Sequence, residues 1–203
     1  DWVTTLPQEN NSFFYPSVSL SYVASKMFEL PDAISNLRLR GSWAEVSNAS
    51  YGGTYSHLQS YDSGINWQNN ASLTFPGNLI SPNLNPETSS AFEGGLVLGL
   101  LDNRLSFDTN FVFVRNFNNL TNAPISVASG FSSRLINANE YEKRGFELVA
   151  RGSPVRSRDF SWDITLNLSR FRTYLTEIDQ GDNIGQLEEG DRADKLYTTV
   201  WQT

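Results

Sequence analysis

Residues 103–114 read NRLSFDTNFVFV, and this stretch narrows the fold to two classes of all-β protein. Bulky apolar and polar side chains alternate with a period of two, so they point to opposite faces of an extended strand. The apolar face carries Leu105, Phe107, Phe111 and Phe113, and the polar face carries Ser106, Asp108 and Asn110. In a soluble sandwich such an apolar face packs on a core, whereas in a membrane barrel it faces lipid and the polar face lines the interior.

The same alternation recurs along the chain, so the sequence predicts six full strands. The five further stretches are residues 14–24, 36–46, 90–101, 143–152 and 160–171. Weaker alternation at residues 1–5 and 195–202 predicts two partial strands. Most of the full stretches reach the roughly 9–11 residues that a membrane strand needs, whereas strands of globular proteins typically have about 5–6. Strand length therefore favours the membrane barrel.

The predicted connections alternate between short and long. Short ones fall at residues 25–35, 101–104 and 151–159, and the first of these has room for one helical turn. Long segments rich in Asn, Ser and Gly fall at residues 47–85 and 118–140. Structureless loops of this length are uncommon in compact soluble domains. The alternation is expected of strands that run up and down through a bilayer, with short periplasmic turns and long extracellular loops.

Composition excludes several other classes. The 203 residues carry a net charge of −7, and the 15 Lys and Arg residues are scattered, which excludes a nucleic-acid partner. Cysteine is absent, so disulfides and thiolate metal sites are excluded. The sequence has no run of 18 apolar residues and hence no spanning helix, but barrel strands are short and only half apolar. A barrel and a sandwich both remain open at this point.

No pattern of catalytic residues is present. The dinucleotide, P-loop and zinc-protease patterns are missing, and His57 is the only histidine. Nothing in the spacing of Glu93, Asp108 and Asp163 brings two of these carboxylates to a shared site. We therefore expect no catalytic residue, no metal site and no cofactor, and a protein that is not an enzyme.

Several segments together resemble one family in both order and spacing. They read DWVTTLP, FYPSVSLSYV, LRLRGSWAEVSN, SPNLNPETSSAFEGGLVLGLLDNRLSFDTNFVF, YEKRGFELV and FSWDITLNLS. This set resembles the β-barrel of SusC/RagA-type TonB-dependent transporters of Gram-negative outer membranes. The chain departs from the family pattern at Ser47, Ser81 and Pro86, where Gly, Asn and Trp are usual. These departures put only the placement within a subfamily in doubt.

The resemblance implies an all-β fold, an antiparallel transmembrane β-barrel segment. Residues 1–203 would form a single partial barrel domain, about a third of a large plugged barrel of the roughly 22-stranded class. The plug domain, the energy-coupling TonB box and the C-terminal strand are expected to lie outside this chain. An arc of strands has two unpaired edges, so it needs the remainder of its own barrel.

The resemblance also implies a function and a location. The expected function is a segment of a TonB-dependent importer in the Gram-negative outer membrane, which takes up an oligosaccharide or oligopeptide nutrient. Its expected partners are the rest of the barrel and plug, a SusD-like surface lipoprotein, the TonB complex and outer-membrane lipid. The competing interpretations are a passive porin or autotransporter barrel and a secreted β-sandwich adhesin.

Three sets of residues are predicted to carry this function. The lipid-facing set comprises Leu98, Phe107, Phe111, Ile164 and Leu166. The polar set that faces the lumen comprises Arg38, Arg40, Glu93, Asp108, Asn110, Asp163 and Asn167. We expect its charged members to pair with one another or with the plug.

The third set lies in the long loop at residues 47–85. It comprises Tyr51, Tyr55, His57, Tyr61 and Trp67. Aromatic rings offer flat apolar faces together with hydrogen-bonding groups, and loops hold many recognition residues. We predict that this set contacts the substrate or the SusD-like lid. The alternative is that these side chains pack against neighbouring loops and cap the barrel.

Overall fold

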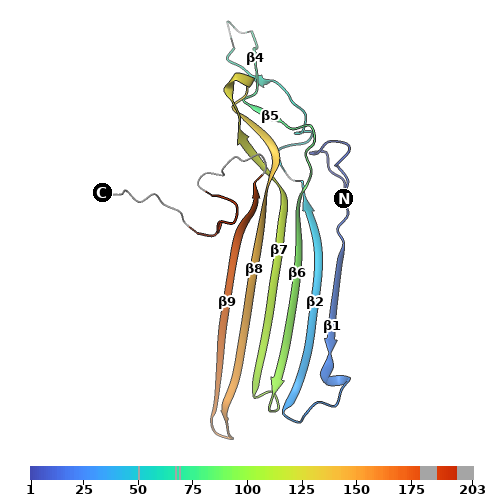
Figure 1. Cartoon of the computed structure of the whole chain (residues 1–203), viewed down its shortest axis with the longest axis vertical. Helices are drawn as coiled ribbons and strands as arrows, with labels where there is room; N and C mark the ends of the chain where they lie inside the picture. Colours follow the sequence, from blue (N-terminus) through green and yellow to red (C-terminus); the bar gives the residue numbers. More distant parts are fainter. Residues whose placement is uncertain (50, 67, 69, 179–186, 196–203) are drawn as a thin grey trace, which may run out of the picture.

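The computed structural model describes residues 1–49, 51–66, 68, 70–178 and 187–195. Long antiparallel strands lie side by side in one gently curved layer (Figure 1). Across the layer they follow the order β1 (Ser17–Val23), β2 (Ile34–Asn48), β6 (Glu87–Leu100), β7 (Leu105–Pro124), β8 (Ser133–Arg156) and β9 (Ser161–Ile178). Each of the six predicted full strands is therefore present. Among the described residues, no helix has the length and apolar character to cross a membrane.

The β1–β2, β6–β7 and β8–β9 connections lie at one end of the layer, and the long β2–β6 connection and the tip of the β7–β8 hairpin lie at the other (Figure 1). The 3-10 helix η1 (Ala24–Lys26) begins the β1–β2 connection, which the sequence predicted to be short, with room for one helical turn. The β6–β7 turn is tight because Leu101, Asp102 and Asn103 all have positive φ, at 53°, 53° and 60°. In the β8–β9 turn, Ser157 N donates to Phe160 O at 2.8 Å. The three connections that the sequence predicted to be short therefore all lie at this end of the layer.

The prediction of a long loop at residues 118–140 is wrong. Strands β7 and β8 stay paired up to Pro124 and Ser133, so only a short tip containing η2 (Val127–Ser129) joins them. The pairing of β7 with β8 continues past two register shifts between Asn116 and Leu120. Asn residues have low strand propensity, which made this segment look like a loop. Here their side chains bond to the backbone and keep the two strands together.

Two smaller predictions are wrong in part, and a third falls almost entirely outside the described residues. Residues 151–159 are not all turn, because β8 continues to Arg156 past a register shift that accommodates Pro154. Residues 1–5 form no strand, since Trp2 pairs only with Ser12 in an isolated bridge. Of residues 195–202, all but Lys195 lie outside the described residues.

The long connection after β2 is mostly irregular, as predicted. It contains β3 (Asp62–Ser63), β4 (Leu73–Thr74) and β5 (Asn78–Ile80), and β5 pairs in parallel with β8 near Leu135. We call residues 1–13, the described part of 49–86 and the β7–β8 hairpin beyond Asn119 the upper region. We call the six long strands below it the wall.

The two clusters of buried apolar side chains in the described residues lie in the upper region. Its main cluster joins Leu6, Ala49, Leu84 and Leu135, and Leu84 is completely buried. A second cluster on the extended hairpin joins Ala123, Ile136 and Ala138. By contrast, large apolar side chains of the wall remain exposed, including Leu20 at 73% and Leu166 at 60%.

Candidate functional site

The strand register sorts the predicted wall residues onto two faces. Directly paired residues of antiparallel strands share a face, and successive residues alternate between faces. One continuous row runs from Leu37 through Leu98, Phe107 and Ala150 to Leu166. All five residues predicted to face lipid lie on this face, which we call the apolar face. All seven polar residues predicted to face the lumen lie on the opposite, polar face.

An ion pair crosses three strands on the polar face. Arg40 Nη2 lies 2.6 Å from Asp108 Oδ1, and the Arg40 side chain passes over Gly95 on the strand between them. A Cβ on Gly95 would overlap Arg40, so glycine leaves the space that this pair needs. Both side chains are more than a third exposed, at 42% and 35%. The pair organises the polar face, and its exposure makes it a weak source of stability.

The other charged side chains of the polar face make no ion pair with one another in the described residues. Asp163 accepts a hydrogen bond from Ser153 Oγ, while Arg38 and Glu93 make no ion pair with the described residues. Arg38, Glu93 and Asn110 line an open hollow of about 260 Å³ beside Arg40. Of the predicted lumen charges, then, two pair with each other and the remainder are available to a partner outside the chain.

Tyr51 belongs to the packing of the upper region. Its ring packs against the cluster of Leu6, Ala49 and Leu84. Its hydroxyl donates to the carbonyl of Ser56 at 3.3 Å, and Ser56 Oγ donates to the carbonyl of Tyr51 at 2.9 Å. Burial raises the pKa of Tyr51 above its ordinary value. This position agrees with the alternative that loop aromatics pack within the loops.

Tyr55 and His57 share a cavity with the N-terminal segment. Their ring centroids lie 6.4 Å apart, and Tyr55 is 58% exposed. The cavity has a volume of about 520 Å³. Its lining residues are Trp2, Thr4, Leu6, Gln8, Asn11, Tyr55, His57 and Leu58. The Nδ1 atom of His57 is buried and has no hydrogen-bond partner among the residues that the structure describes. Flat rings thus stand beside amide and hydroxyl groups, as in sites that bind sugars or peptides.

The sequence did not predict Trp2, Gln8 and Asn11 as part of this cavity. They come from a segment about fifty positions before Tyr55, and backbone bonds bring the two together. Tyr55 N donates to Thr4 O at 3.1 Å, and Thr5 Oγ1 donates to Ala49 O at 2.6 Å. No local sequence pattern predicts that the N-terminal segment pairs with this loop.

Tyr61 lies elsewhere, in an aromatic contact between two loops. Its ring meets Phe75 edge-on with centroids 5.4 Å apart, and Phe75 lies 5.4 Å from Phe131 at the tip of the β7–β8 hairpin. These three rings connect the long loop to the hairpin. The last predicted member of the loop set, Trp67, lies outside the described residues.

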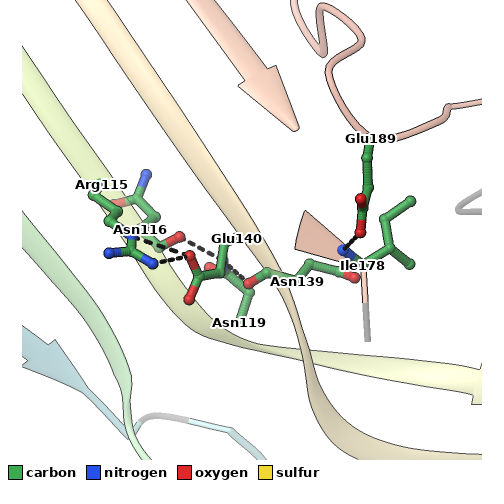
Figure 2. Close-up of polar contacts among 7 residues, drawn as sticks. All are labelled: Arg115, Asn116, Asn119, Asn139, Glu140, Ile178 and Glu189. Carbon is green, nitrogen blue, oxygen red and sulfur yellow. Dashed lines mark hydrogen bonds and ion pairs between the residues drawn. The ribbon is translucent and has the colours of Figure 1, made fainter. Parts of the chain in front are cut away.

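A polar junction separates the wall from the extended hairpin (Figure 2). Arg115 on β7 donates from Nε and Nη2 to Glu140 Oε2 on β8, at 3.0 and 2.5 Å. Asn119 Nδ2 donates to the carbonyls of Asn139 and Asn116, at 2.8 and 3.3 Å. These bonds satisfy backbone carbonyls where the ladder shifts register, so β7 and β8 continue past the irregularity.

Comparison with known proteins identifies the class. The family described as TonB dependent receptor-like, beta-barrel matches residues 1–199. The chain therefore belongs to the β-barrel family of TonB-dependent receptors, and its antiparallel sheet is part of a barrel. This result excludes the secreted β-sandwich.

The relatives to which the chain is similar include further TonB-dependent receptors, SusC among them. The chain is 27% identical over 191 residues to TonB-dependent receptor P3 of Formosa agariphila, covering 91% of the chain and 19% of that receptor. It is 23% identical over 216 residues to TonB-dependent receptor SusC of Bacteroides thetaiotaomicron, covering all of the chain and 21% of SusC.

Solved structures agree with these relatives. The RagAB peptide transporter is 25% identical with a TM-score of 0.73, over 89% of the chain and 20% of that structure's chain. The RagAB importer in its open-open state gives a TM-score of 0.75. The chain thus spans about a fifth of the length of its relatives. The resemblance inferred from the sequence is confirmed.

Proposed function

We propose that this chain forms part of the wall of a TonB-energised importer in the Gram-negative outer membrane. Its cargo would be a nutrient of the oligopeptide or oligosaccharide class. The observation that carries the proposal is the match to the RagAB peptide transporter over 89% of the chain. The two-faced register agrees with it, because a barrel wall needs one face for lipid and one for a wet interior.

In this proposal each face has its own task. Leu98, Phe107 and Leu166 contact acyl chains, and the polar face with the Arg40–Asp108 pair surrounds the plug and the passing substrate. Transport changes access to a site and makes no bond, so binding groups suffice. Energy arrives from the inner membrane through TonB.

The upper region would face the cell exterior and receive the substrate or a SusD-like lipoprotein. The support is the cavity that Trp2, Tyr55 and His57 line together. It presents exposed rings at the end of the layer where the long connections lie (Figure 1). Tyr51 and Tyr61 would hold this region together by packing.

The proposal is tested by uptake in cells that express the full-length transporter. We expect the double variant Tyr55→Ala/His57→Ala to reduce uptake or lipoprotein association while the barrel assembles normally. Leu73→Ala is the control, because Leu73 is an exposed apolar residue of the same loop that lies outside the cavity. Unchanged uptake and unchanged association in the double variant would rule out this role of the cavity. Uptake that persists without TonB would show a passive porin.

Orientation has its own test. A cysteine at Asn103, in the tight β6–β7 turn, should be protected from a membrane-impermeant label added to intact cells. A cysteine at Ala128, at the hairpin tip, should be labelled. The opposite pattern would reverse the assigned orientation.

A further inference from the structure

Three arginines form a layer at the upper edge of the apolar face. Arg144 on β8 is the direct partner of Arg172 on β9. Arg170 lies two residues along β9 on the same face, opposite Phe146. We call these three residues the arginine layer.

The layer marks a sharp boundary of charge. Below the row that holds Phe111, Phe146 and Arg170, the apolar face of the long strands carries no charged side chain down to Ile164. Above the layer, on the side of the long connections, lie Glu142 and the Arg115–Glu140 pair (Figure 2). On this face, the arginine layer therefore carries the first charged side chains above the apolar band of the described strands.

The layer is short of counter-charge within the chain. Like charges directly opposite each other destabilise an antiparallel pair, and Arg144 and Arg172 are such a pair. Arg144 Nη2 contacts Glu142 Oε2 at 2.6 Å, yet the Arg144 side chain stays 64% exposed. The side chains of Arg170 and Arg172 form no ion pair with any residue that the structure describes. An anion between the guanidinium groups would offset the repulsion.

Aromatic rings lie close to Arg144, one of the three members of the arginine layer. The Arg144 guanidinium lies 5.7 Å from the ring centroid of Phe113 and 6.0 Å from that of Tyr174. Phe113 shares a row of the apolar face with Trp43 and Phe92. Aromatic rings in this position are typical of a barrel at the membrane–water interface.

We propose that the arginine layer binds the phosphate groups of a multiply phosphorylated glycolipid in the outer leaflet. The inference rests on the proposed function, which places the apolar face in lipid and the long connections outside. Guanidinium groups bind phosphate oxygens in a bidentate manner, and their apolar stems lie along an apolar surface. Three neighbouring arginines suit a headgroup with more than one phosphate better than a phospholipid with a single one.

The test uses the purified full-length transporter, bisphosphorylated lipid A and native mass spectrometry. The variant Arg144→Gln/Arg170→Gln/Arg172→Gln should retain lipid A at least tenfold less than the wild type, because even one lost charged hydrogen bond corresponds to about that factor. Dephosphorylated lipid A should bind the wild type as weakly. The control Arg151→Gln/Arg156→Gln removes charge from the polar face and should bind lipid A normally. If the triple variant does not assemble, Arg172→Gln alone serves, with a smaller expected loss.

Several results would overturn the inference. Equal retention of lipid A by wild type and variant would do so, as would equal binding of the dephosphorylated form. Phosphatidylglycerol that binds as well as lipid A would transfer the site to phospholipid. Nutrient uptake is measured on the same proteins to separate the two proposals. A wild type that binds lipid A through the layer but imports nothing contradicts the proposed function alone.

Discussion

The wall and the upper region contain similar apolar side chains but bury them differently. In the upper region Leu6 and Leu84 are 1% and 0% exposed, so the chain supplies its own core there. In the wall Leu20 is 73% exposed and Phe111 is 59% exposed, although the backbone between the strands is fully paired. The upper region is thus stabilised by packing within the chain, whereas the proposed function has lipid cover the apolar face of the wall and has further strands pair with the edges of the sheet.

Strands β7 and β8 show the difference within one ladder, because they cross both regions. Below Asn116 their side chains divide into an apolar and a polar face. Above the register shifts, Leu120 packs against the main cluster, and Ala123 and Ile136 join the second. The same pair of strands therefore forms part of the two-faced wall and also the scaffold of a small core.

The largest expected effect is a loss of stability in the upper region, with the stability of the wall unchanged. Leu84→Ala removes a fully buried side chain and leaves a cavity, so it should destabilise the upper region by about 4 kcal/mol. Limited proteolysis of the full-length transporter should show faster cleavage in residues 49–86. The shift in electrophoretic mobility that heating causes when the barrel unfolds should stay unchanged. Leu58→Ala, at a 58% exposed position, is the control. Faster unfolding of the barrel itself would contradict the separation of the two regions.

The next largest effect is the cost of placing a charge on one face of the wall, and this cost depends on whether that face lies in lipid or in water. Leu166→Arg places a charge on the apolar face and should cost about 3 kcal/mol in a bilayer. Ser169→Arg, on the polar face opposite Glu147, should cost much less. Denaturant unfolding of the full-length barrel in lipid vesicles measures both. Equal costs on the two faces would refute the assignment of lipid to the apolar face.

A smaller effect concerns the contact between loops in the upper region. Phe75→Ala removes both aromatic contacts of Phe75 and should loosen the hairpin tip by about 1 kcal/mol. Hydrogen exchange at Phe131 and its neighbours should rise. Tyr61→Phe keeps the ring and is the matched control. Unaltered exchange in Phe75→Ala would show that the two loops are held by other contacts.

The smallest effect concerns the ion pair of the polar face. Asp108→Asn should change barrel stability by about 0.5 kcal/mol, because the pair with Arg40 is partly exposed to solvent. A double-mutant cycle with Arg40→Gln measures the coupling. A coupling several times larger would mean that the plug or a neighbouring strand shields this pair from water.

The sequence predicted part of the candidate site. It selected Tyr55 and His57, which do share a cavity, together with Tyr51 and Tyr61, which pack in two other places. It missed Trp2, because the contact depends on a backbone bond between Tyr55 and Thr4 across the long loop. Aromatic residues in a loop indicate a potential for contact, but their spacing does not tell which rings meet.

The sequence by itself determined the strands and their two faces. Alternation is a local property of the extended chain, so Phe107 and Asp108 must point apart wherever the strand lies. Only the tertiary structure decided how far the strands continue and what meets across them. The β7–β8 hairpin persists because Asn119 bonds to Asn139, and Arg144 faces Arg172 because β8 and β9 pair in one register. Both depend on partners about 20 to 30 residues apart, whose pairing is set by the combined energy of the whole ladder.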